Sequence, residues 1–139
     1  SPMNMLGYYN SFELTQAVMK DGYFISNDIG YFDNQGNLYY VSRKGDVINI
    51  GGYKISPSDV EEVALLSGMV KECVCICSNN KLNMKQLSLL VVPEKDFDVK
   101  GLLKFISCKL EAYKVPKSVE VVDNIHKTFN GKIDRKYYR

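Results

Sequence analysis

The chain has 139 residues, of which 45% are hydrophobic and 24% charged, and its formal net charge is +2 at pH 7. This composition is ordinary for a globular domain, and so small a charge does not by itself indicate nucleic acid or an anionic membrane as a partner. No apolar run approaches the roughly 20 residues of a membrane-spanning helix, and residues 1–7 lack the apolar core of a signal peptide. We therefore expect a cytoplasmic chain without a membrane-spanning segment.

The first third of the chain predicts a helix and a β-hairpin. Residues 11–20 read as a short helix with Ser11 as its N-cap. Residues 23–33 and 37–43 are rich in aromatic and β-branched side chains and flank a turn, so they are expected to pair. Residues 1–43 are too few for a core of their own, and we interpret them as the C-terminal edge of a larger domain that is missing here.

A linker and a second hairpin follow. Residues 44–46 interrupt the apolar pattern with Lys, Gly and Asp, which makes them the best candidate for a linker. Residues 47–50 and 53–55 read as two short strands on either side of a Gly-Gly turn. We expect a second, small domain to span residues 47–139.

The small domain should combine helices with a small sheet. Ser56 can cap a helix whose first position suits Pro57, and Asp59 and Glu61 complement the positive end of that helix. The elements expected after it are strands at 73–77 and 87–92, a helix at 99–110, a strand at 119–122 and a helical turn at 133–139. The predicted fold is α+β: a sheet of about three strands with packed helices plus a two-stranded hairpin, preceded by the β-hairpin segment.

The four cysteines favour a reduced core over a metal site. Cys73, Cys75 and Cys77 alternate, so a strand would place all three on one face, and Cys108 lies apart. A structural zinc site needs four ligands, usually gathered from turns, and the single histidine, His126, is distant in sequence. We predict buried, reduced thiols and assign no metal ligand.

Lys132 follows Gly131 in a basic run near the end of the chain. Glycine leaves the approach to the ammonium open, and an ammonium is a compact point charge suited to phosphate and carboxylate oxygens. A mobile tip of this kind suits a reaction in which negative charge builds up on phosphorus. The alternatives are a solvated basic tail or a nucleic-acid-binding patch with aromatic stacking surfaces, which the acidic Asp123 and Asp134 would dilute.

Six runs occur in one order along nearly the whole chain. They are MLGYYN at 5–10, DGYFISNDIG at 21–30, SRKGDVI at 42–48, GGYKISPSDVE at 51–61, YKVP at 113–116 and NGK at 130–132. Together they resemble the C-terminal part of the adenylate-forming acid–CoA ligases, a superfamily that also contains peptide-synthetase adenylation domains and luciferases.

The resemblance implies a reaction in two halves. A carboxylate attacks the α-phosphate of ATP to give an acyl-adenylate and pyrophosphate, and a thiol, usually CoA, then displaces AMP to give a thioester. The small domain would act as a lid that rotates between the halves. The implied ligands are ATP or AMP, CoA, a small carboxylic acid and Mg²⁺, with the Mg²⁺ ligands in the chain's own missing N-terminal large domain. The alternative acceptor is the pantetheine of a carrier protein, as in peptide synthetases.

By similarity, Asp28 accepts hydrogen bonds from the ribose hydroxyls, Arg43 reaches the ribose or a phosphate, and Lys132 contacts the carboxylate and the α-phosphate. Gly45 would be the hinge, where the family commonly has Asp or Lys. The family's Thr-Gly-Asp is Ser26-Asn27-Asp28 here, which leaves the loop shape open. Ser42 replaces the usual glycine before the arginine.

The turn Gly51-Gly52 with Tyr53 and Lys54 resembles the loop that faces the active site in the second half-reaction. Glycines there leave room for a pantetheine arm, and Lys54 is equally well explained as a CoA-phosphate contact or as a plain exposed charge. The family's Ser/Thr/Gly-rich phosphate loop and its acyl pocket are absent from this chain. The sequence therefore does not name the acid, and the chain alone should be inactive.

Overall fold

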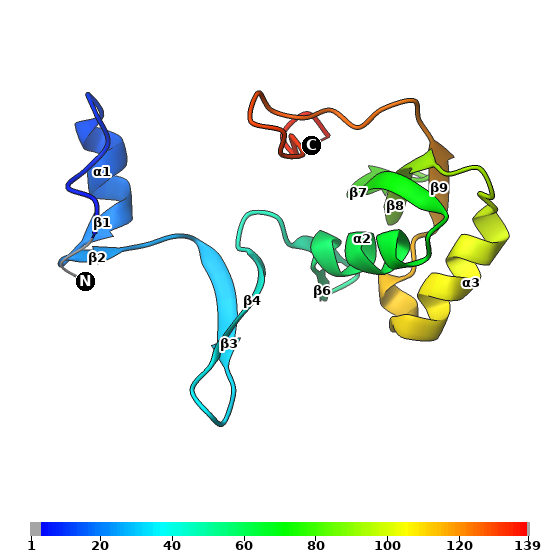
Figure 1. Ribbon diagram of the computed structural model, residues 1–139, viewed down its shortest axis with the longest axis horizontal. Helices are drawn as coiled ribbons and strands as arrows, with labels where there is room; N and C mark the ends of the chain where they lie inside the picture. Colours follow the sequence, from blue (N-terminus) through cyan, green and yellow to red (C-terminus); the bar gives the residue numbers. More distant parts are fainter. Residues whose placement is uncertain (1–3, 139) are drawn as a thin grey trace. The chain divides into compact units, whose positions relative to one another are not determined.

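The computed structural model describes residues 4–138 of the chain (Figure 1). The chain forms two compact units, one ending at Gly45 and the other beginning at Asp46. This boundary falls among the residues 44–46 that the sequence proposes as a linker; that they act as a hinge stays a prediction.

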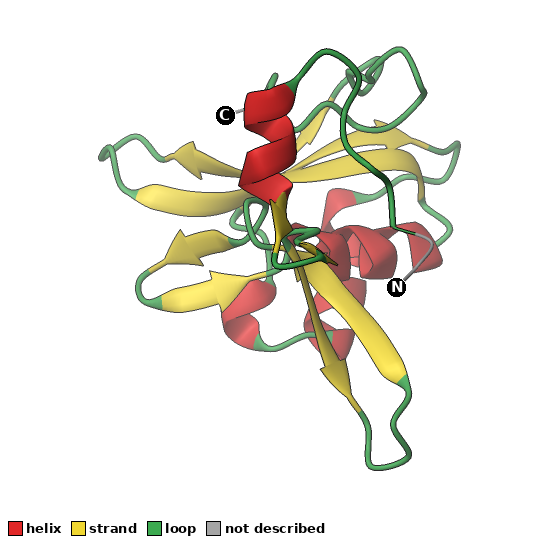
Figure 2. Ribbon diagram, turned by 90° about the vertical axis from the view of Figure 1, so that its left-hand side faces the viewer, coloured by secondary structure: helices red, strands yellow, loops and turns green. Residues whose placement is uncertain are grey.

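The first unit consists of one short helix and two small antiparallel sheets. Its longest strands form a two-stranded ribbon that ends in a turn at residues 33–37 (Figure 2). In chain order the elements are α1 (Phe12–Val18), β1 (Met19–Lys20), β2 (Tyr23–Phe24), β3 (Asp28–Phe32) and β4 (Leu38–Arg43).

The predicted helix at 11–20 is too long, although Ser11 occupies the N-cap position as predicted. Met19 and Lys20 leave the helix to pair with β2 across a tight turn in which Asp21 has a φ of 51°. The Ser11 side chain makes no capping hydrogen bond. Its carbonyl oxygen instead accepts the Thr15 hydroxyl at 2.8 Å, one turn along the helix.

The second unit confirms the predicted α+β fold. The sheet has the order β7-β8-β9, with β7 and β8 antiparallel and β8 and β9 parallel, and β5 and β6 form the separate hairpin. In chain order the elements are β5 (Ile48–Ile50), β6 (Tyr53–Ile55), α2 (Pro57–Leu66), β7 (Val70–Asn79), β8 (Lys85–Pro93), α3 (Val99–Lys109), the 3₁₀ turn η1 (Ala112–Lys114) and β9 (Ser118–Val121).

Each face of the three-stranded sheet is covered by a different part of the chain. Helices α2 and α3 cover one face with Val60, Ala64, Leu102 and Ile106, which pack in the same cluster as the β7 thiols. The C-terminal segment covers the other face, where Ile125 packs with residues of β7 and β8. Successive side chains of β7 therefore point to opposite faces of the sheet, and each face packs in a separate hydrophobic core.

Three predictions about this unit are wrong. Residues 133–138 form turns instead of a helical turn, because Ile133 pairs with Lys127 in a β-bridge. The Ser56 hydroxyl makes no cap; it is buried without a hydrogen-bond partner in the structure. Glu61 lies beyond the first turn of α2, where Asp59 is the acidic residue, and its buried carboxylate pairs with Arg135.

The thiols divide into two pairs. All four cysteines are unpaired; Cys73 and Cys75 are buried, as predicted, but Cys77 and Cys108 are exposed. Cys77 lies two positions before the end of β7, and Cys108 is the second-last residue of α3. Across residues 4–138, no helix is both long and apolar enough to traverse a lipid bilayer.

Candidate functional site

Asp28 and Arg43 lie opposite each other at the open end of the β3–β4 hairpin. The Arg43 Nε lies 3.4 Å from the Asp28 Oδ1, with 65% of the arginine side chain and 42% of the aspartate side chain exposed. Ion pairs this exposed add little to stability. Because both side chains are exposed, both groups are accessible to a ligand. A carboxylate accepts two hydroxyl donors and a guanidinium binds phosphate oxygens, so the pair fits a ribose and its phosphate.

The loop before Asp28 has the unusual backbone that its sequence suggests. Asn27 has a φ of 60°, a left-handed conformation that asparagine adopts more readily than most residues. Its carbonyl oxygen accepts the Lys44 N–H at 2.8 Å, and the Ser26 hydroxyl oxygen accepts the Asp28 N–H at 3.2 Å. The left-handed backbone of Asn27 and these two hydrogen bonds define the bend that precedes Asp28.

Lys132 lies on a closed hairpin instead of a loose tail. The Lys132 carbonyl oxygen accepts the backbone N–H of Thr128 at 2.8 Å and its hydroxyl at 3.0 Å. The Gly131 N–H donates to the Thr128 carbonyl oxygen at 2.9 Å, which closes the turn. Lys132 itself is exposed, and Phe129 at the tip of the turn is fully exposed.

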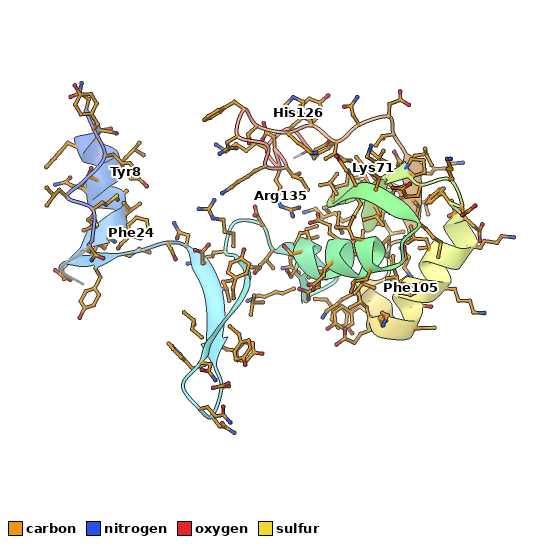
Figure 3. The ribbon with its side chains drawn as sticks, viewed as in Figure 1. Tyr8, Phe24, Lys71, Phe105, His126 and Arg135 are labelled. Atoms are coloured by element: carbon orange, nitrogen blue, oxygen red, sulfur yellow. The ribbon has the colours of Figure 1, made fainter. Side chains whose placement is uncertain are left out.

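The base of this hairpin is held by contacts on both of its sides. Lys127 Nζ lies 2.7 Å from a carboxylate oxygen of Glu72 on β7. The backbone N–H of His126 donates to the Tyr138 hydroxyl at 2.7 Å, and its ring stacks on Tyr137 with 4.2 Å between ring centroids. His126 and Arg135 both project from this C-terminal segment (Figure 3). The backbone that carries Lys132 is therefore well defined.

The Gly51-Gly52 turn is exposed, and contacts of neighbouring residues with η1 and α2 hold its base. A β-carbon added to either glycine would meet nothing within 4 Å. Tyr53 stacks on Tyr113 of η1 with 4.5 Å between ring centroids. Next to Tyr113, Lys114 Nζ lies 3.3 Å from the Asp59 carboxylate at the start of α2. The turn therefore projects as an open tip from a fixed base, with Lys54 also exposed.

The predicted site residues belong to two groups. The structure brings Asp28 and Arg43 together in the first unit, whereas Lys132 and the Gly51-Gly52 turn belong to separate elements of the second unit. Within residues 4–138, no three His, Cys, Asp or Glu side chains gather in a way that could hold a metal ion.

The comparison with protein families identifies the chain. The model of the AMP-binding enzyme C-terminal domain matches residues 59–132, which is more than half of the sequence. This chain belongs to that family. The match begins in α2 and ends on Lys132, so it spans the sheet of the second unit and the lysine hairpin.

The relatives of this family member are CoA ligases. The chain is 37% identical over 132 residues to an oxalate–CoA ligase of Arabidopsis thaliana, which covers 94% of the chain and 26% of the relative. It is 36% identical over 137 residues to a long-chain-fatty-acid–CoA ligase of Bacillus subtilis, which covers 97% of the chain and 24% of the relative. The chain thus spans about a quarter of the length of these ligases.

A solved structure shows the same fold. The o-succinylbenzoate CoA synthetase of Bacillus subtilis, solved in complex with its acyl-adenylate intermediate, matches with a TM-score of 0.89 and 30% identity. The match covers 97% of this chain and 28% of that enzyme. The chain is therefore a segment from the family of acyl- and aryl-CoA ligases.

Sequence reasoning missed one feature of this segment. Glu61 and Arg135 are 74 positions apart, yet they form a bidentate ion pair. The only local signal was an acidic residue on the apolar face of α2, one position after the buried Val60.

Proposed function

We propose that this chain is the C-terminal part of an AMP-forming carboxylic acid–CoA ligase. The observation that carries the proposal is an exposed lysine on a closed hairpin, in a chain whose relatives are CoA ligases along nearly its whole length. The full enzyme activates an acid with ATP to acyl-AMP and transfers the acyl group to CoA. Residues 1–43 belong to its large domain, 44–46 to the hinge and 47–139 to the lid.

The proposed nucleotide site includes the pair at the open end of the β3–β4 hairpin. Asp28 accepts hydrogen bonds from the ribose hydroxyls of ATP, and Arg43 contacts the ribose or a phosphate. The 3.4 Å contact between them supports these roles, since the guanidinium keeps the carboxylate oriented across the hairpin. The ligands for Mg²⁺, which screens the phosphates, are expected in the large domain.

Lys132 is the proposed catalytic residue of the first half-reaction. The attacking carboxylate is already ionised near neutral pH, so this step needs no general base. Its chemical demand is for positive charge beside the α-phosphate, where negative charge accumulates in the transition state. A positioned charge of this kind contributes roughly 100- to 1000-fold in rate. The closed hairpin supports the role because it presents the ammonium in a defined direction.

The second half-reaction requires another face of the lid, and Gly45 is the proposed hinge. A β-carbon on Gly45 would meet nothing within 4 Å, and its φ is not left-handed. The described conformation therefore does not require glycine, which leaves its rotational freedom available for a second conformation. After rotation, the open Gly51-Gly52 turn, with Tyr53 and Lys54, would face the active site and leave room for a pantetheine arm.

The alternative acceptor is a carrier protein, as in peptide synthetases. The open Gly51-Gly52 turn supports a pantetheine arm in either case, because CoA and a carrier protein present the same thin arm. The relatives named above are CoA ligases, which favours CoA. The rate of AMP release from the full-length ligase, measured once with CoA and once with a phosphopantetheinylated carrier protein, decides between the two acceptors. The acceptor that gives the faster release is the correct one.

The test is to separate the half-reactions in the full-length ligase. We expect Lys132→Ala to reduce the rate of acyl-AMP formation about 100- to 1000-fold, measured as the rate of pyrophosphate release. Thioester formation from supplied acyl-AMP should stay close to the wild-type rate, because the lysine is used only in the first half-reaction. Lys136→Ala is the matched control, since it removes an exposed lysine from the same segment. Equal loss of both half-reactions in Lys132→Ala would contradict the assigned role.

A further inference from the structure

Arg135 forms a bidentate ion pair that joins the C-terminal segment to the rest of the second unit. Its Nη1 lies 2.8 Å from Glu61 Oε1 and its Nη2 2.6 Å from Glu61 Oε2, which makes the pair bidentate. Its Nε lies 3.6 Å from the carboxylate of Asp46, the first residue of the unit. One guanidinium thus joins the C-terminal segment, α2 and the start of the unit.

Glu61 is itself fixed from the other side. β7 is an edge strand, and the Cys75 N–H donates to Glu61 Oε1 at 2.8 Å. The Glu61 side chain is only 11% exposed and that of Arg135 21%. A fork-shaped guanidinium on a buried carboxylate restricts both distance and orientation, which a single ammonium cannot do.

This contact lies close to the lysine hairpin. Arg135 is three residues after Lys132, and Ile133 between them is bridged to Lys127 on the opposite side of the hairpin. The Asp134 N–H donates to the His126 carbonyl oxygen at 3.0 Å, directly before Arg135. Any displacement of Arg135 is therefore transmitted to the hairpin through a few backbone bonds.

The other charged anchor of the hairpin is weaker. The Lys127–Glu72 pair is 40% and 34% exposed, and exposed pairs contribute little. Buried ion pairs are not reliable sources of net stability either, and their best-attested use is to specify one arrangement over its alternatives. The structure therefore favours a role for Arg135 in geometry over a role in stability alone.

We propose that Arg135 is a positioning residue for Lys132: its bidentate contact with Glu61, together with the contact to Asp46, sets the position of the lysine hairpin relative to the residue that follows Gly45. The inference rests on the proposed function of Lys132 in adenylation. It predicts that loss of the contacts from Arg135 to Glu61 and Asp46 impairs acyl-AMP formation, which uses Lys132, and spares thioester formation.

The experiment uses the full-length ligase with three substitutions. Arg135→Met removes the guanidinium while keeping an unbranched apolar side chain. Arg135→Lys keeps the charge but not the fork, and Lys136→Met removes a neighbouring exposed charge as the matched control. We expect Arg135→Met to slow acyl-AMP formation about 10- to 100-fold, because a displacement of about 1 Å costs on that order. Arg135→Lys should recover part of this loss. The KM for ATP and thioester formation from supplied acyl-AMP should stay within about twofold.

A second measurement on the present chain does not depend on catalysis. Amide hydrogen exchange at Thr128 and Asp134, whose N–H groups close the hairpin, should be about tenfold faster or more in Arg135→Met, with β7–β8 amides unchanged. Lys136→Met should leave all of these rates unchanged.

Three outcomes would overturn the inference. Adenylation within twofold of wild type in both Arg135 variants, while Lys132→Ala abolishes it, would refute positioning and leave the proposed function intact. Equal loss of both half-reactions in Arg135→Lys would show a structural role only. Unaffected adenylation in Lys132→Ala would refute the proposed function, and the positioning role with it.

Discussion

Burial divides the cysteine side chains into two chemical classes. Cys73 and Cys75 are 3% and 2% exposed. Removal from water raises the pKa of the Cys73 thiol to about 12, and the nearby Glu61 carboxylate adds to the rise while Arg135 opposes it. The same causes raise the pKa of Cys75 as well. At neutral pH both side chains are protonated and behave as small apolar groups.

Thiol labelling tests this division. At pH 8 a thiol of pKa about 12 has a thiolate fraction of only about one in 10⁴, and the thiolate is the reactive form. We expect Cys77 and Cys108 to react with an aromatic disulfide reagent in the native chain, and Cys73 and Cys75 to react only after unfolding. The Cys77→Ser, Cys108→Ser double variant should show no fast reaction. Fast labelling of that variant would show that the helices do not seal the sheet.

The β5–β6 hairpin owes its turn to two consecutive glycines. Gly51 and Gly52 have φ values of 58° and 86°, and two positive φ angles are typical of the tight turns that match the twist of a two-stranded hairpin. The strands that they join pair Ile50 with Tyr53 and Ile48 with Ile55. Ile55 is buried among the helices, so the shape of the turn also sets how β6 enters the core.

Replacing one of these glycines should cost stability even though space is available. We expect Gly52→Ala to lower the free energy of unfolding of the chain by about 1 kcal/mol, because alanine is strained at a positive φ. Urea unfolding measures the change. Gly45→Ala is the matched control: its φ is not left-handed and its β-carbon would also meet nothing. It should leave stability unchanged or raise it by up to about 1 kcal/mol. Equal destabilisation by both changes would contradict this account.

At the scale of the whole molecule, the first unit exposes many large apolar side chains. Leu6 is 102% exposed, Tyr9 94% and Phe12 73%. Exposed large apolar side chains in such numbers are typical of an interaction site. It supports the proposal that residues 1–43 complete a larger domain, in agreement with relatives of about four times the length.

The chain by itself should therefore not catalyse the reaction. We expect no pyrophosphate release above background from the purified chain with ATP, Mg²⁺ and a panel of carboxylic acids, because the proposed function requires a phosphate-binding loop and an acyl pocket that we expect in the large domain. The full-length ligase under the same conditions is the positive control. Formation of acyl-AMP by the chain alone would show that its residues suffice for catalysis.

Much of the architecture could be predicted because it depends on local chemistry. The turn glycines, the alternation in β7 and the Pro57 helix start each act within a few residues, so their elements were found. The ends of the elements were less predictable. β7 extends to Asn79 and α1 stops at Val18, because strand pairing overrides local preference at those positions.

The sequence by itself determined the family and the candidates Asp28, Arg43 and Lys132, because the order of short motifs along the chain can be read without knowledge of the fold. Only the tertiary structure decided that Glu61 and Arg135 meet at the edge of β7. The physical reason is that a salt bridge between residues 74 positions apart depends on which surfaces the folded chain brings together, and no local pattern carries that information.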